Sequence, residues 1–119
     1  MKTTSQPGAR ADAALSQAMD GLWERFLPEI KDRVVVLEAA AQAAGKGKLT
    51  AKQREAAQSA AHKLAGVLGT FGLTRGTVLA RELELTFARE SSPRRDSGAK
   101  LAEIAAELRA MIESRKPSS

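Results

Sequence analysis

Apolar residues recur at every third or fourth position along most of the chain, which is the spacing of one face of an α-helix. Between about residues 12 and 44, this spacing joins Leu15, Met19, Leu22, Phe26, Ile30, Val34, Leu37 and Ala41. Three further stretches share the period, from about 50 to 71, from 74 to 87 and from 93 to 115. No stretch shows the alternation of a half-buried strand, so the pattern predicts an all-α protein.

Short polar segments separate these stretches and indicate how the helices are arranged. A glycine-rich segment at 45–48 ends the first, and Thr50 with Gln53 forms a capping box that opens the second. Connections this short make successive helices antiparallel neighbours. We therefore expect an antiparallel up-and-down four-helix bundle with an N-terminal helical extension. Pro28 either starts a new helix or kinks one long helix.

The length of 119 residues fits one domain. Residues 1–10 contain one Gly, one Pro and several small polar residues, so we expect a disordered tail there, a bundle over 11–115 and a second disordered tail over 116–119. The N-terminus has no apolar segment of the kind found in secretory signals. No apolar run reaches the roughly 18 residues of a membrane span. We expect a cytoplasmic protein with no membrane partner.

Composition excludes several classes of site. The chain has no Cys and one His, His62. This excludes disulfides, a thiol nucleophile and any metal site built on cysteines or on two histidines. Spacing suggests no pair of catalytic carboxylates and no nucleophile with a neighbouring base. We therefore expect no metal site, no cofactor and no enzyme in its own right.

A helical wheel at about 100° per residue predicts the direction in which His62 points. Apolar residues of the second helix gather on one side, which is the expected core face: Ala57, Ala60, Ala61, Leu64, Leu68 and Phe71. His62 lies roughly 150° from the centre of that stripe by the same arithmetic. The pattern therefore predicts an exposed imidazole.

Two glycines share the face of His62. Gly66 follows it by one turn and Gly69 by about two. A glycine in a helix interior costs about 1 kcal/mol relative to alanine. With the small side chains of Ser59 and Ala65 nearby, these positions leave room for a partner or a phosphoryl group beside the imidazole.

The segment from Ala61 to Leu73, AHKLAGVLGTFGL, resembles the phosphorylation-site helix of histidine phosphotransfer (HPt) domains. The stretch 79–84 is similar to the following helix of that family, and 22–30 is similar to its first long helix. The resemblance covers roughly residues 15 to 113. It implies a phosphorelay intermediate, in which His62 accepts a phosphoryl group from a kinase or a receiver aspartate and passes it to a receiver domain.

The resemblance also implies roles for the neighbours of His62. Gly66 and Gly69 would leave space for the docking receiver, and the catalytic Mg²⁺ would belong to that receiver. Many HPt motifs carry a lysine where this chain has Ala65. Lys63 is expected to swing toward the phosphoryl group in its place, or Gln58 to donate a hydrogen bond, with Ser59 also near the receiver. We expect the carrier to be a monomer.

The charge balance leaves two other functions open. The formal net charge is +5, which suits an acidic partner. A basic helical protein that binds nucleic acid would use Lys46, Lys48, Lys52 and Arg54, with Arg94 and Arg95 as a second patch. Against it, the basic residues are scattered among acidic ones and no aromatic platform is present, so we expect no nucleic-acid partner. A helical interaction module without phosphotransfer is the other alternative.

Overall fold

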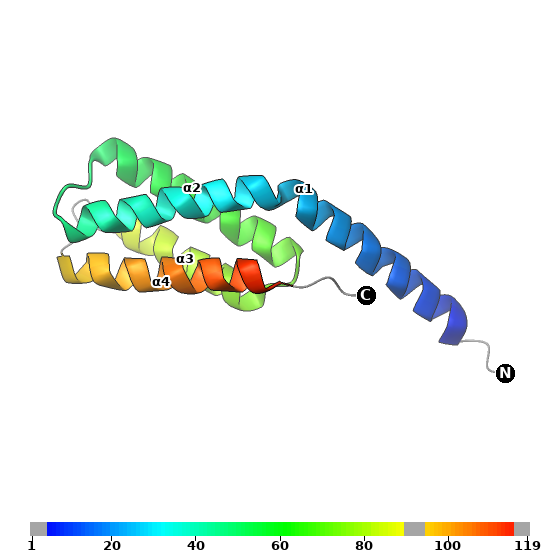
Figure 1. The fold of residues 1–119 in the computed structure, drawn as a ribbon. Helices are drawn as coiled ribbons and strands as arrows, with labels where there is room; N and C mark the ends of the chain where they lie inside the picture. The colour runs from blue at the N-terminus through cyan, green and yellow to red at the C-terminus, as the bar shows by residue number, and fades with distance from the viewer. Residues whose placement is uncertain (1–4, 90–94, 116–119) are drawn as a thin grey trace.

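The computed structural model describes residues 5–89 and 95–115, which form four helices. They are α1 (Ser5–Gly45), α2 (Ala51–Thr70), α3 (Thr74–Arg89) and α4 (Arg95–Ser114). Each helix packs on the next, and α1 also packs along α4, which closes the bundle (Figure 1). The described residues contain no strand. The predicted all-α, up-and-down four-helix bundle is confirmed.

Helix α1 is much longer than the other three, and its N-terminal part projects beyond the bundle (Figure 1). It passes through Pro28 without a break in the helix, although the ribbon changes direction in this region. A proline inside a helix removes one backbone hydrogen bond and bends the axis. Of the two alternatives for Pro28, one long kinked helix is therefore correct, and the predicted helical extension is present.

The disordered tail expected over residues 1–10 is wrong for residues 5–10, because α1 already begins at Ser5. Pro7 lies in the first turn, where the backbone N–H has no partner within the helix and proline is tolerated. Pro7 and Gly8 therefore lie inside α1 and do not mark its start. Residues 1–4 and 116–119, where the rest of the expected tails fall, lie outside the described residues.

The core is apolar throughout and draws on all four helices. Its largest fully buried side chains are Phe87, Ile30, Leu37, Leu64, Leu68, Leu79, Leu83, Leu101, Leu108 and Val34. The stripe predicted for the first helix is buried only from Ile30 onward, whereas Leu15 is 63% exposed and Phe26 is 40% exposed. The ring of Phe71, at the end of α2, packs against Trp23 with centroids 5.2 Å apart. The ring of Phe26 also lies near that of Phe71, with centroids 6.5 Å apart, and the exposure of the stripe is greatest at Leu15, farthest from this contact in sequence.

Arg115 joins the extension to the rest of the bundle. Its guanidinium carbon lies 4.8 Å from the centre of the Trp23 ring, and its Nη2 lies 3.3 Å from Oδ1 of Asp20. Cation–π and charge interactions are stronger when the groups are shielded from water, and both charged side chains are largely buried. The base of the extension is therefore fixed to the C-terminal end of α4.

Two polar contacts set the helix boundaries and the pairing of α1 with α4. The Thr50 hydroxyl accepts a hydrogen bond from the Gln53 backbone N–H, which confirms Thr50 as the N-cap of α2. Arg109 of α4 donates two hydrogen bonds, of 2.6 and 2.7 Å, to the Glu38 carboxylate of α1. These hydrogen bonds hold the pKa of Glu38 below its ordinary value. No helix in the described part of the chain has the length and apolar character needed to cross a membrane.

Candidate functional site

His62 lies in the middle of α2 and points away from the core. Its side chain is 72% exposed. On the opposite face of the helix, Ala57, Ala60, Ala61, Leu64 and Leu68 are buried and Phe71 is half-buried. The exposure predicted for His62 is therefore confirmed, and the site stands on a helix whose position is fixed by the core.

The imidazole is held by a carboxylate on the neighbouring helix. Nδ1 of His62 lies 2.9 Å from Oε2 of Glu84, and the Glu84 side chain is 28% exposed. An ionised carboxylate can only accept a hydrogen bond, so the proton of a neutral imidazole resides on Nδ1 in this contact. Nε2 then carries the free lone pair. The geometry selects one tautomer and makes Nε2 the nucleophilic nitrogen.

Sequence reasoning missed Glu84 as a site residue. It lies 22 positions after His62, in a stretch whose resemblance to a family helix carried no role for it. The two side chains meet because α2 and α3 form an antiparallel pair, in which Ala65 and Ala80 are buried. The sequence of a single helix cannot indicate a contact between side chains of two different helices.

The two glycines near His62 differ in their surroundings. A Cβ atom on Gly66 would meet nothing within 4 Å. A Cβ on Gly69 would lie 3.4 Å from the Thr77 hydroxyl oxygen, so Gly69 borders α3 while remaining exposed. Neither position needs glycine for packing within this chain. The open space beside the imidazole is therefore a surface feature of the folded protein.

The other residues predicted for the site are divided between surface and interface. Ser59 and Lys63 are exposed and Gln58 is half-buried, and none of these three side chains forms a hydrogen bond or an ion pair with another described residue. Ala65 was expected to border the exposed face, but it is only 3% exposed. Its carbonyl oxygen accepts a 3.1 Å hydrogen bond from the Thr77 hydroxyl, because this side of α2 packs against α3.

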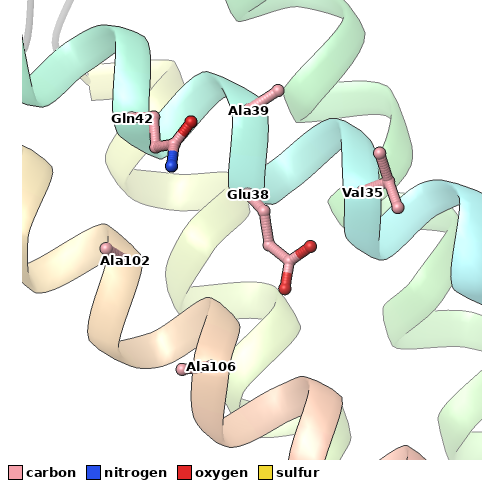
Figure 2. A pocket seen from close by; sticks show the side chains of 6 residues that line it. All are labelled: Val35, Glu38, Ala39, Gln42, Ala102 and Ala106. Atoms are coloured by element: carbon pink, nitrogen blue, oxygen red, sulfur yellow. The ribbon is translucent and has the colours of Figure 1, made fainter.

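Two other features of the described surface were compared with the His62 site, a possible metal cluster and a hollow between α1 and α4. Among the described residues, no three His, Cys, Asp or Glu side chains are close enough together to hold a metal ion. A hollow between α1 and α4 is lined by Glu38 and several small or apolar residues, and Figure 2 shows the Glu38 carboxylate reaching toward α4. That carboxylate is already paired with Arg109. The hollow contains no nucleophile.

Fewer of the basic residues expected to form a nucleic-acid site are exposed than the sequence predicts. Lys46, Lys48 and Lys52 are exposed near the start of α2. Arg54 instead turns inward and donates a 3.2 Å hydrogen bond to the Phe87 carbonyl, which links α2 to the end of α3. Arg94 and the side chain of Arg95 lie outside the described part of the structure.

Comparison with known proteins identifies the family of the chain. The family model described as "Hpt domain" matches residues 21–115. Protein RcaC from Microchaete diplosiphon is 42% identical over 62 residues, a match that covers 52% of this chain and 10% of that protein. No solved structure gives a significant match. Since the family match covers most of the chain, and His62 stands exposed on a helix of a four-helix bundle within it, the chain belongs to the Hpt domain family.

Proposed function

We propose that this Hpt domain carries a phosphoryl group on Nε2 of His62, receiving it from a kinase or a receiver aspartate and passing it to a receiver domain. Hpt domains are phosphotransfer carriers of two-component signalling and interact with receiver domains and histidine kinases. The observation that carries the assignment to His62 is its exposed imidazole, with Nδ1 held by Glu84 and Nε2 left free.

The transfer step follows from this arrangement. The Nε2 lone pair attacks the phosphorus of an aspartyl phosphate, the N–P bond forms, and the P–O bond to the aspartate breaks to release a carboxylate. Nδ1 keeps its proton, so the imidazole ring becomes positively charged as the bond forms. The Glu84 carboxylate, 2.9 Å away, stabilises that charge. Attack by a second receiver aspartate on the same phosphorus reverses the step.

The partner is expected to supply the remaining chemistry. Transfer of a phosphoryl group needs cationic groups or metal ions around its oxygens. The exposed Lys63 is the cation nearest in sequence to His62 and is free to approach a bound phosphoryl group. We place the Mg²⁺ ion on the receiver. The Hpt domain then acts as a carrier, without a catalytic metal site of its own.

Transfer from a phosphorylated receiver tests this function directly. The protein is incubated with radiolabelled phospho-receivers and Mg²⁺, and in parallel with active histidine kinases. We expect label on the chain that is stable in alkali and lost in acid, as for a phosphoramidate. If a broad panel of receivers and kinases transfers nothing, the interaction-module alternative replaces this proposal. Salt-sensitive DNA binding without transfer would instead support the nucleic-acid alternative.

Replacing Glu84 with glutamine slows phosphotransfer while the fold is kept. The amide preserves the size of the side chain but removes the negative charge that stabilises the imidazolium. A hydrogen bond to a charged group is worth about 1.5–3 kcal/mol, so we expect the rate to fall about 10- to 100-fold. Rapid-quench phosphotransfer measures this rate. Glu82→Gln is the control, since Glu82 is exposed on the same helix; equal rates for both variants would remove Glu84 from the mechanism.

Replacing Gly66 with leucine stabilises the fold and weakens receiver docking. The side chain enters open space, and leucine favours a helix over glycine by about 0.5–1 kcal/mol. The same bulk blocks the approach to Nε2 of His62, one turn earlier, so transfer slows. Urea unfolding and transfer kinetics measure the two effects. Gly21→Leu, which also enters open space in α1, is the matched control; normal transfer by Gly66→Leu contradicts the docking role.

A further inference from the structure

Two contacts between α2 and α3 fix the register in which these antiparallel helices lie. Glu84 is level with His62, since their side chains meet at 2.9 Å. Two turns away, Thr77 is level with Gly69, where an added Cβ would lie 3.4 Å from the Thr77 hydroxyl oxygen. The two pairs are separated by seven residues on each helix, in opposite directions. Arg81, three residues before Glu84, therefore lies about 4.5 Å along the helix axis from the level of His62.

Arg81 also lies on the side of α3 that borders α2. At about 100° per residue, it is about 60° around the helix from Glu84, whose carboxylate holds the imidazole. The opposite side of α3 faces α4, because Arg75 there donates a 3.0 Å hydrogen bond to Glu107. Arg89 is the remaining arginine of α3, and it points about 80° away from Arg81 and lies about two turns further along. Arg81 is therefore the arginine of α3 placed beside the imidazole.

The guanidinium of Arg81 is available to a ligand. Its side chain is exposed and forms no hydrogen bond or ion pair with another described residue. On this flank of the imidazole α2 itself contributes no cation, because Ala65 is 3% exposed and its carbonyl is bonded to α3. A Cβ on Gly66 would meet nothing within 4 Å, so the surface one turn after His62 is open. The long side chain of arginine spans an axial distance of about 4.5 Å.

We propose that Arg81 binds the oxygens of the phosphoryl group carried on Nε2 of His62. This inference rests on the proposed phosphotransfer and adds a residue to it. A phosphoryl group brings about 1.5 to 2 negative charges, and the Glu84 carboxylate already lies on this flank. A guanidinium there offsets the repulsion and donates parallel hydrogen bonds to the phosphoryl oxygens. Lys63 lies on the other flank of His62, so the two cations approach the group from different sides.

Chemical phosphorylation with phosphoramidate tests this role without a protein partner. Nε2 of His62 attacks the phosphorus of the reagent, its P–N bond breaks and ammonia leaves. We expect Arg81→Gln to slow this labelling about tenfold or more, because charge-assisted hydrogen bonds to the phosphoryl group are lost. Arg81→Lys keeps the charge and should recover part of the rate. Arg89→Gln is the matched control, since Arg89 is also exposed and without a described partner, and it should leave the rate nearly unchanged.

The outcomes separate this role from the function on which it rests. Equal rates for Arg81→Gln and Arg89→Gln overturn the proposal, as does a wild-type chain that phosphoramidate does not label. Failure of the proposed function gives a different result, in which no receiver or kinase transfers phosphate while chemical labelling of His62 still depends on Arg81. That result overturns the relay and supports the phosphoryl-binding role of Arg81. Circular dichroism verifies that the variants fold.

The contact itself is tested by NMR of the arginine Nε–H groups, labelled with ¹⁵N. The signal that Arg81→Lys lacks belongs to Arg81, and the signal that Arg89→Lys lacks belongs to Arg89. We expect phosphorylation of His62 to shift the Arg81 signal strongly and the Arg89 signal little. A role of Arg81 in helix stability alone would produce no such difference. An Arg81 signal that does not move on phosphorylation overturns the proposal.

Discussion

Replacing His62 with glutamine leaves a folded protein that accepts no phosphoryl group from any receiver or kinase. The amide of glutamine has no lone pair that can attack phosphorus at neutral pH. The chain has no second imidazole to substitute. Folding is expected to persist because the side chain is 72% exposed and, among the described residues, forms a hydrogen bond with the Glu84 carboxylate alone. Transfer of labelled phosphate measures the loss, and circular dichroism measures the fold.

The control for this variant is Gln53→Ala, a change elsewhere on α2 that should leave transfer intact. A His62→Gln protein that still accepts phosphate at the wild-type rate would show that another group is the acceptor. Loss of helical signal in His62→Gln would make the result uninformative about chemistry. In that case His62→Ala, which keeps a good helix former at the position, provides the decisive comparison.

Replacing Gly98 with alanine destabilises the bundle strongly. An added Cβ would collide with the backbone of Gly45, with its Cα 2.5 Å away, and would lie 3.0 Å from the carbonyl carbon of Ala44. Backbone atoms cannot move aside as a flexible side chain can, so α4 must shift away from α1. Overpacking of this kind costs about 1–3 kcal/mol or more, whereas alanine in an open helix position is favourable.

Urea unfolding measures the effect on stability. We expect a clearly lower midpoint for Gly98→Ala and an unchanged or higher midpoint for the control Gly21→Ala, whose Cβ enters open space. The folded fraction of Gly98→Ala should still accept phosphate, because the contact joins α1 to α4 while His62 and Glu84 lie on α2 and α3. A midpoint equal to that of the wild type would contradict this prediction, because it would mean that α1 and α4 can move apart to admit the Cβ atom without a loss of stability.

Much of the fold could be predicted because most of its signals are local. The three-to-four-residue period defined the helices, and Thr50 and Gln53 marked the start of α2 through one hydrogen bond between near neighbours. The exposed part of the α1 stripe could not be predicted in the same way. Leu15 and Leu22 have the same period as Ile30 and Val34, and they are exposed because α2 ends near Phe71, whose ring packs against those of Trp23 and Phe26.

The site shows the same division between local and distant information. The outward direction of His62 followed from the arrangement of apolar residues on its own helix, and the structure confirms it. Its contact with Glu84 and the burial of Ala65 both depend on how α3 lies against α2. Those two facts determine which nitrogen is free and which flank of the imidazole is closed. Neither fact could be predicted from the sequence of α2 alone, because both depend on how α2 and α3 pack together.

The position of the phosphoryl group on the imidazole tests the central claim most directly. The protein, labelled with ¹⁵N in its single histidine, is phosphorylated by a receiver or kinase and its ring nitrogens are observed by NMR. Because Nδ1 keeps its proton and donates a hydrogen bond to Glu84, we expect phosphorus coupled to Nε2 of His62 and a protonated Nδ1. Phosphate on Nδ1, or on any other residue, would contradict it.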